Sequence, residues 1–542
     1  MFGLMQEWPL RIHTIIDHAA KYHPKRRVIS RSVEGPIHTT DYAVLRLRAL
    51  KLAQALVREG MKPGDRIATL AWNTARHFEA WYGITGAGCV YHTVNPRLFR
   101  DQIAWIINHA EDRLILVDLT FVPILEAIQA NIPTIQKFVI LTDPTHMPVT
   151  TLKNAICYEE WLQSADGDFS WVKGDENAAA GMAYTSGTTG NPKGVVYSHR
   201  SNVLHALAVN GGDYLGLTSR DTVMPVVPLF HANGWSIAFA APMAGAELVL
   251  PGAKLDGASI HELLENHGVT ITAAVPTVWL GLLQHLDSLG GKLTSLKRVV
   301  VGGSACPRAM TEAFETRYGV SVSHAWGMTE MSPLGSFCSL KPETATLTGD
   351  ALYNLKVKQG HPPFTVDMKI TDDSGAEQPW DGATFGRLKV KGPAVSKQYF
   401  KGDGGHLLDT EGFFDTGDVA TIDDNGYMQI TDRTKDIIKS GGEWISSIDI
   451  ENLAMGHASV AEAAVIGIAH PKWDERPLLI IVLKPHAHAE KASILAFLNN
   501  KIAKWWMPDD VVFVTEIPHT STGKTQKTAL REQFKDYVFP VL

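Results

Sequence analysis

One loop of this chain concentrates groups that bind phosphate. Its sequence is Tyr184-Thr-Ser-Gly-Thr-Thr-Gly-Asn-Pro-Lys-Gly194. Glycines let backbone N–H groups turn toward an anion, hydroxyls add donors that rotate to fit phosphate oxygens, and lysine adds a positive charge. The loop therefore predicts a phosphate site that contains Thr185, Ser186, Gly187, Thr188, Thr189, Gly190 and Lys193.

Two different kinds of loop could have a similar composition. A Walker-type nucleotide loop needs lysine and then serine or threonine directly after its second glycine. Here Asn191 follows Gly190, so that template fails. A solvated polar loop is the common case for such a composition, and only the motifs further along the chain argue against it.

The elements around the loop predict where ligands bind. Residues 178–184 form an apolar run that predicts a buried strand leading into the loop. Further along, predicted strands alternate with predicted helices, in the order strand 271–275, helix 276–286, strand 298–301, helix 307–317 and strand 320–325. This alternation indicates parallel sheets covered by helices, an α/β fold in which ligands bind beyond the carboxyl ends of the strands.

After Asp418 the pattern changes to that of a smaller α+β unit. A hairpin is predicted over 422–430, around Asn425-Gly426. We then expect a helix at 447–455, strands at 460–468 and 477–484, a helix at 490–505 with one apolar stripe, and a strand at 511–515. The stripe consists of Ile494, Leu498, Ile502 and Trp505. We place the domain boundary at 433–436, between an N-terminal domain of 1–432 and a C-terminal domain of 437–542.

Seven more motifs follow the phosphate loop in order: Pro228–Trp235, Val301–Ser304, Trp326–Glu330, Phe414–Asp418, Asp432–Asp436, Lys439–Glu443 and Thr520–Lys524. Together with the loop they resemble the adenylate-forming superfamily, which comprises acyl- and aryl-CoA synthetases, firefly-type luciferases and the adenylation domains of peptide synthetases. The resemblance runs through most of the chain. It implies that the C-terminal domain is mobile and that residues 433–436 are its hinge.

The resemblance also implies a reaction in two steps. A carboxylate is a poor electrophile, so it first attacks the α-phosphorus of ATP to give an acyl-adenylate, from which the thiol of CoA then displaces AMP. Because such phosphoryl chemistry depends on positioning and charge neutralisation, the site needs cations and a metal ligand. We assign Lys524 as the lysine that bridges carboxylate and α-phosphate, Thr329 to the α-phosphate, and Glu330 with Thr185 to Mg²⁺. Without the resemblance, an exposed lysine and an acidic helix start would be the ordinary interpretation of these residues.

The same resemblance assigns the nucleotide site. Asp418 would accept hydrogen bonds from the ribose hydroxyls, Arg433 would reach the ribose or phosphate, and Trp326 would stack on adenine. Gly302 and Gly303 would allow a close approach of adenine or the acyl group, and Gly327 lies beside Trp326. For Asp418 alone, a turn aspartate after glycine is the simpler interpretation.

A second set of residues would act after the domain rotates. Lys435 stands where the superfamily has its hinge. The CoA channel or AMP would then be contacted by Lys439, Gly441, Gly442, Glu443 and Trp444. A glycine pair with neighbouring charges is ordinarily a plain turn.

The acid site is predicted around Trp235, with His231, Gly302, Met331 and Pro333. In fatty-acid CoA synthetases a tryptophan in this motif gates the acyl tunnel, although a single tryptophan is more often a core residue.

Within the ligases, the chain resembles bacterial short- and medium-chain acyl-CoA ligases, and we expect 3-methylthiopropionate and related acids as substrates. The alternatives are a medium- or long-chain fatty-acid CoA ligase and an acyl-AMP ligase that loads a separate carrier protein. A luciferase-like oxidative enzyme and a non-enzymatic ATP-binding relative are less favoured.

Composition excludes several other classes. The net charge is −7 and no long basic run occurs, so a nucleic-acid partner is not expected. The four cysteines have no paired spacing, which argues against a disulfide framework or a zinc site. We find no secretory signal and no apolar run of membrane-spanning length. We therefore expect a cytoplasmic protein, and a homodimer, that uses a small carboxylic acid, ATP, Mg²⁺ and CoA.

Overall fold

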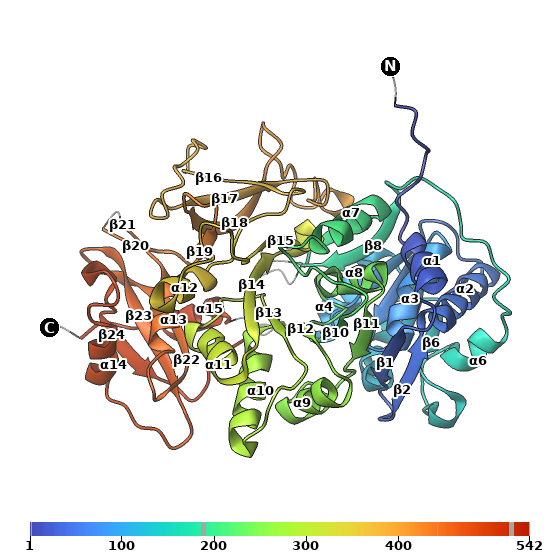
Figure 1. Cartoon of the computed structure of the whole chain (residues 1–542), viewed down its shortest axis with the longest axis horizontal. Coiled ribbons are helices and arrows are strands. Elements are labelled where there is room, and N and C mark those ends of the chain that lie inside the picture. Colours follow the sequence, from blue (N-terminus) through green and yellow to red (C-terminus); the bar gives the residue numbers. More distant parts are fainter. Residues whose placement is uncertain (2, 186–190, 442, 520–524, 541–542) are drawn as a thin grey trace.

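The structure is a computed structural model that describes residues 1, 3–185, 191–441, 443–519 and 525–540. Within these residues the strands form four sheets (Figure 1). The described part contains no helix that is long and apolar enough to cross a membrane.

The first large sheet carries the predicted phosphate loop. Its strand order is β7-β6-β5-β3-β4-β8-β9, with every neighbouring pair parallel except β8 and β9. The strand expected at 178–184 is β8, and the loop connects it to β9. The strands are β3 (Arg66–Leu70), β4 (Val90–Thr93), β5 (Leu114–Val117), β6 (Lys137–Ile140), β7 (Ala155–Cys157), β8 (Ala179–Tyr184) and β9 (Gly194–Ser198).

The second large sheet has the order β15-β14-β13-β12-β10-β11-β1-β2. Its inner strands are parallel, and antiparallel β2 and β15 form its edges. The predicted alternation is confirmed in β12, α10 (Pro276–Leu289), β13, α11 (Arg308–Tyr318) and β14. The strands are β1 (Arg27–Arg31), β2 (Ile37–Asp41), β10 (Thr222–Pro225), β11 (Glu247–Leu250), β12 (Ile271–Ala274), β13 (Arg298–Val301), β14 (Ser321–Gly327) and β15 (Leu334–Phe337).

Helices fill the space between the two large sheets and cover their outer faces. One core cluster joins Leu116 of β5, Leu248 of β11, Trp81 of α3 and Phe239 of α8, so these helices lie between the sheets. Inner strands such as β5 and β11 are covered on both faces and are buried along their length, whereas the edge strand β2 is polar and largely exposed. The helices of this part are α1 (His13–Tyr22), α2 (Tyr42–Arg58), α3 (Ala75–Gly86), α4 (Arg100–Ala110), α5 (Val122–Ile128), α6 (Tyr158–Gln163), α7 (His199–Val209), α8 (Ile237–Ala244), α9 (Gly257–Asn266) and α12 (Gly349–Lys356).

A third, antiparallel sheet follows, with the order β16-β17-β18-β19. Its last two strands form the hairpin predicted around Asn425-Gly426, where Gly426 has a φ of 77° that glycine adopts readily. The strands are β16 (Asp367–Thr371), β17 (Gly386–Lys391), β18 (Phe414–Ile422) and β19 (Met428–Arg433).

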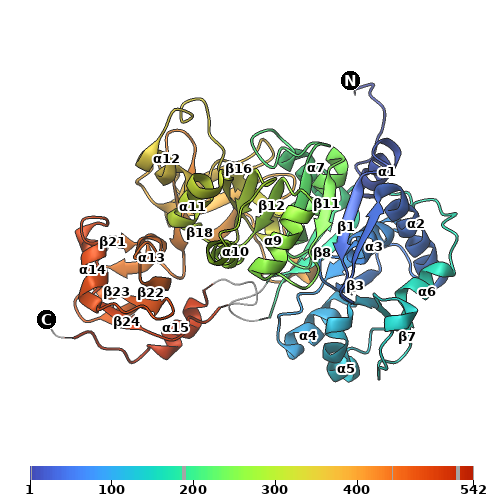
Figure 2. The same cartoon turned by 60° about the horizontal axis from the view of Figure 1, so that its bottom comes forward.

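The C-terminal elements form a small sheet with helices, at the opposite end of the molecule from β1–β7 (Figures 1 and 2). This arrangement confirms the predicted fold class of a large parallel-rich N-terminal part and a small C-terminal α+β part. The elements are β20 (Ile438–Ser440), β21 (Glu443–Ile445), α13 (Ser447–Ala454), β22 (Val460–His470), β23 (Asp474–Leu483), α14 (Lys491–Leu498), β24 (Asp510–Phe513) and α15 (Lys527–Gln533).

One predicted helix is wrong in its second half. The helix expected over 490–505 ends at Leu498, because the next residues leave the helical region and Asn500 has a φ of 64°. Asparagine tolerates this left-handed conformation better than most residues. Ile502 and Trp505 still pack against the same core as Ile494, but Ile502 does so from a loop and Trp505 from the short 3₁₀ helix Lys504–Trp506.

Candidate active site

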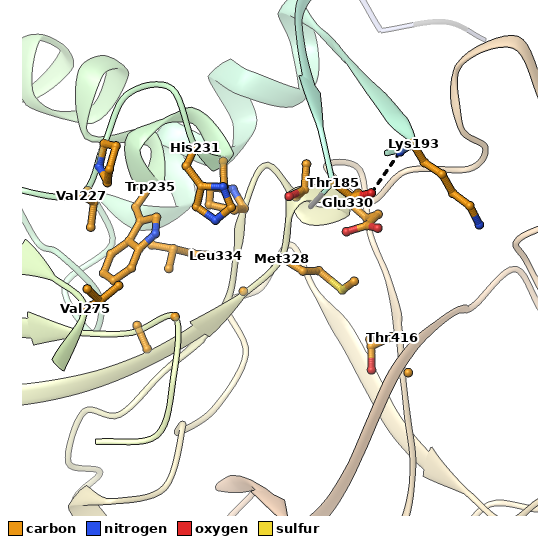
Figure 3. Close-up of a pocket in the computed structure, with 18 of the residues that line it drawn as sticks. Thr185, Lys193, Val227, His231, Trp235, Val275, Met328, Glu330, Leu334 and Thr416 are labelled. Carbon is orange, nitrogen blue, oxygen red and sulfur yellow. Dashed lines mark hydrogen bonds between the residues drawn. The ribbon is translucent and has the colours of Figure 1, made fainter. Parts of the chain in front are cut away.

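A cavity of about 720 Å³ lies beyond the carboxyl ends of strands from both large sheets (Figure 3). In Figure 3, Glu330, Thr185 and Lys193 lie at one end of this cavity and Trp235 and Val275 at the other, with Met328 between them. Segments far apart in the sequence therefore meet here, as expected for an α/β fold. The predicted site residues that line the cavity are Thr185, Lys193, His231, Trp235, Gly303, Gly327, Thr329, Glu330, Pro333 and Arg433.

The polar end of the cavity contains a buried carboxylate. Glu330 is 6% exposed, and burial raises the pKa of its carboxyl group. The hydroxyl of Tyr399 donates a hydrogen bond of 2.6 Å to Glu330 Oε1, which favours the charged form. Nearby, the hydroxyl of Tyr197 donates to the carbonyl oxygen of Thr329 at 2.8 Å. Two tyrosines thus hold the Thr329-Glu330 pair in place.

The two ends of the phosphate loop are joined by hydrogen bonds. The backbone N–H of Thr185 donates to the carbonyl oxygen of Lys193 at 2.9 Å, and the N–H of Lys193 donates to Thr185 Oγ1 at 3.2 Å (Figure 3). Lys193 Nζ lies 5.0 Å from the centre of the Tyr399 ring, within range of a cation–π interaction. Several predicted site residues lie outside the described residues. In the loop these are Ser186, Gly187, Thr188, Thr189 and Gly190, and elsewhere they are Gly442 and Lys524.

Asp418 is fixed by two donors on opposite sides. Trp326 Nε1 donates to Asp418 Oδ2 at 2.9 Å, and Arg433 Nε contacts Oδ1 at 2.8 Å. The ladder between β18 and β19 places Asp418 opposite Arg433. Asp418 is 3% exposed, while its neighbours Thr416 and Gly417 line the cavity. The carboxylate therefore lies directly beside the cavity, with its orientation already set.

Two other predicted residues lie in the core beneath this region. Trp326 is 7% exposed and packs in one apolar cluster with Met331 and Phe414. The structure thus gives the Trp326 indole a definite contact, with Asp418, whereas stacking on adenine stays a prediction. Met331 likewise stays a predicted substrate residue, although its side chain is part of this core.

The apolar end of the cavity is formed around Trp235. The nearest wall is the backbone of Gly302, because a Cβ atom there would lie 2.8 Å from Trp235 Cη2 and 2.9 Å from the carbonyl oxygen of Ala325. A side chain at position 302 would therefore clash with both the indole and the backbone of Ala325. Other apolar side chains that lie near Trp235 are those of Val227, Val275 and Leu334 (Figure 3).

The residues assigned to a second domain orientation lie elsewhere. Lys439 is on β20, Glu443 and Trp444 are on β21, and Gly441 lies between these strands. The N–H of Gly441 donates to the carbonyl oxygen of Trp473, and the residue has a φ of 59°. In the described part of the chain, the cavity lining does not include Lys435, Lys439 or Gly441. Their roles after a domain rotation stay predictions.

The oxygen atoms at the polar end of the cavity suit a hard cation that takes only a few ligands from the protein. Among the described residues no group of three or more His, Cys, Asp or Glu side chains could hold a metal. Mg²⁺ needs no such cage, because it commonly takes one or two protein oxygens and completes its shell with water and phosphate. Glu330 and Thr185 supply oxygens at the cavity wall, so the residues fit this ion.

Sequence reasoning missed Tyr399, Tyr197 and Thr416. Tyr197 could have been found, since it follows the phosphate loop on a strand and alternation turns it inward with Val195. Tyr399 carried no such signal, because it lies 69 residues from Glu330 in a loop.

Comparisons with known proteins identify the family and the fold of the chain. The family model of the AMP-binding enzymes matches residues 16–400, and that of the AMP-binding enzyme C-terminal domain matches residues 449–524. The chain is 47% identical over 536 residues to the 3-methylmercaptopropionyl-CoA ligase of Ruegeria lacuscaerulensis, covering 99% of both chains. It is also 47% identical to the medium-chain-fatty-acid–CoA ligase of Ectopseudomonas oleovorans, covering 99% of this chain and 98% of that one. The solved structure of the anthranilate CoA ligase AuaEII with anthranoyl-AMP has the same fold, with a TM-score of 0.86, 23% identity and 98% of each chain covered.

Proposed function

Because this chain belongs to the AMP-binding enzyme family and is an AMP-forming acyl-CoA ligase, we propose that it activates short- and medium-chain acids, 3-methylthiopropionate among them. The observation that carries this proposal is the Trp235 indole, which lines the apolar end of the cavity and lies against Gly302. Both relatives at 47% identity support the proposal, since one is named for 3-methylmercaptopropionate and the other for medium-chain fatty acids.

The proposed acid site discriminates weakly between neighbouring chain lengths. One methylene in an apolar pocket changes binding by roughly 1–3 kcal/mol, so several acids should react. A short thioether would also gain from sulfur–aromatic contact with Trp235, by about 0.3–1.5 kcal/mol. The carboxylate would then point toward Thr329 and Glu330, at the polar end.

In the first step a carboxylate oxygen attacks the α-phosphorus of ATP, and diphosphate leaves. We assign Thr329 to the α-phosphate, and the loop from Thr185 to Lys193 to the other phosphates. Asp418 and Arg433 are assigned to the ribose. Mg²⁺, held by Glu330 and Thr185, would neutralise phosphate charge when bound. Lys524 is the proposed cation between the carboxylate and the α-phosphate.

In the second step the thiol of CoA releases its proton to solvent, its sulfur attacks the acyl carbonyl carbon, and AMP leaves with the electrons of the broken C–O bond. We propose that residues 433–436 act as the hinge and that Lys439, Gly441, Gly442, Glu443 and Trp444 face the site in this step.

A cytoplasmic location is supported by the four cysteines, all of which are free and buried. A homodimer stays a prediction.

A panel of acids tests the proposal. The purified enzyme would receive ATP, Mg²⁺, CoA and each acid from propionate to palmitate, with 3-methylthiopropionate, and AMP and thioester would be measured. We expect equal amounts of the two products and a kcat/KM for palmitate about tenfold or more below that for octanoate. An optimum at palmitate would favour a long-chain ligase. If AMP were released without formation of acyl-CoA, and a thioester formed only when a carrier protein was added, an acyl-AMP ligase would be favoured.

A further inference from the structure

The segment that carries Trp235 has a backbone conformation that most residues avoid. Five consecutive residues are left-handed, with φ of 45° at Ala232, 55° at Asn233, 53° at Gly234, 53° at Trp235 and 64° at Ser236. For L-residues other than glycine this region is unfavourable, and asparagine is among the few that visit it readily. Such a turn persists only where the surrounding structure holds it firmly.

The anchor of this turn is the side chain of Asn233. Its Oδ1 accepts a hydrogen bond of 2.9 Å from the Tyr91 hydroxyl, and its Nδ2 donates to Asn202 Oδ1 at 3.1 Å. Asn202 Nδ2 in turn donates to the carbonyl oxygen of Ser198 at 3.1 Å. Tyr91, Asn202 and Asn233 are fully buried, so water cannot replace these bonds.

Both partners of Asn233 belong to rigid elements. Tyr91 lies on β4 and stacks on Trp81, with ring centres 4.5 Å apart and planes 3° apart. Asn202 lies in the first turn of α7. At the other end of the turn, Ser236 Oγ is buried without a hydrogen-bond partner in the described part of the chain, and the next fixed point is the carbonyl oxygen of Ala238 in α8, which accepts from the Tyr82 hydroxyl at 2.7 Å. The position of Trp235 therefore depends on the bonds made by Asn233, two residues before it.

We propose that Tyr91 and Asn202 are specificity-determining positioning residues, which act through Asn233 to hold the left-handed turn and so keep the Trp235 indole against Gly302. The inference rests on the proposed function, in which that indole ends the acid site. Release of the turn lets its residues move toward favourable backbone conformations, and the indole leaves its place. Acids longer than the cavity then bind, and short acids lose the surface on which they pack.

The test compares variants across a series of acids. Tyr91→Phe removes one hydrogen bond of Asn233 and keeps the ring on Trp81, and Asn202→Ala removes the second one together with the bond from Asn202 to Ser198. The matched control is Tyr42→Phe, which removes a fully buried hydroxyl that donates to the carbonyl oxygen of Ala246 at 2.6 Å. For each variant, kcat/KM would be measured from butyrate to dodecanoate, with the KM for ATP and the melting temperature.

We expect Tyr91→Phe to raise the ratio of kcat/KM for dodecanoate over butyrate by about fivefold, the effect of one buried hydrogen bond. The KM for ATP should stay unchanged, and Tyr42→Phe should keep the wild-type ratio. Equal scaling of all acids in Tyr91→Phe and Asn202→Ala, as in Tyr42→Phe, would overturn the inference.

Trp235→Ala separates this inference from the proposed function. If that variant loses activity mainly on butyrate and 3-methylthiopropionate, the indole acts on the acid, and the result for Tyr91→Phe decides the inference alone. A wild-type chain-length profile in Trp235→Ala would contradict the proposed function, and the inference would fail with it. Tyr91→Phe removes only the hydroxyl group and keeps the ring, so it can be measured even if Asn202→Ala does not fold.

Discussion

The carboxylate of Asp418 has its orientation set by side chains on either side of it. Trp326 donates to one oxygen from the core, and Arg433 contacts the other from a partly exposed position. Each carboxylate oxygen can accept a further hydrogen bond, so the proposed ribose contacts remain available. At the scale of single residues, the site thus depends on side chains that lie behind its surface as well as on those that line it.

Trp326→Phe tests this arrangement. The change removes the indole N–H, so one oxygen of the buried Asp418 carboxylate loses its hydrogen-bond donor. Loss of such a bond should weaken the binding of ATP about tenfold. We expect the KM for ATP to rise by about that factor, with a smaller effect on the KM for the acid. Steady-state kinetics with each substrate varied in turn measures both constants. A rise confined to the KM for the acid would contradict the assignment.

At the scale of elements, α13 begins in a cluster of carboxylates. Asp432 accepts hydrogen bonds from the N–H and hydroxyl of Ser447, and Lys527 contacts Glu451 at 2.8 Å. Burial, together with the nearby charge of Asp432, raises the pKa of Asp449 to about 6. At a pH between the ordinary aspartate pKa near 3.9 and about 6, Asp449 is ionised in the unfolded chain but still protonated in the folded protein.

This shift predicts how stability depends on pH. The folded state binds more protons than the unfolded state between about pH 4 and 6, so Asp449 lowers stability as pH rises through that window. Asp449→Asn should therefore raise the melting temperature at pH 7 by about 1–3 °C, and by less at pH 4.5. Differential scanning fluorimetry at both pH values measures the change. An equal shift at both would show that ionisation of Asp449 is not the cause.

The predicted hinge, residues 433–436, spans the last residue of β19 and most of the short segment before β20. Lys435→Pro restricts φ there, and hinges work by absorbing changes in φ and ψ. We expect near-normal formation of the acyl-adenylate and a large loss of thioester formation. Lys524→Ala is the matched variant, and it should fail in adenylate formation while still converting a supplied acyl-adenylate. Equal losses in both steps for Lys435→Pro would indicate misfolding or a hinge at another position.

At the scale of the whole molecule, the sequence predicted the strand–helix alternation over 271–325, the strand before the phosphate loop and the C-terminal elements, but not the strands of residues 1–177 or β16 and β17. Gly303 and Glu330 follow neighbouring parallel strands, whose carboxyl ends lie at the same edge of the sheet. The left-handed turn could not be predicted, because only Asn233 and Gly234 in it favour that conformation. Tyr399 was missed because loops bring distant residues together without periodicity, and the helix ending at Leu498 was extended because apolar spacing continued past Asn500.

The most direct test of this account is a crystal structure with an inert sulfamoyl analogue of 3-methylthiopropionyl-AMP. We predict that the ribose hydroxyls bond to Asp418, that the sulfamoyl group lies beside Thr329, and that the methylthio group contacts the Trp235 indole in front of Gly302. If the adenosine binds outside this cavity, or the acyl tail runs past the indole into a different space, the assignment of the site is contradicted.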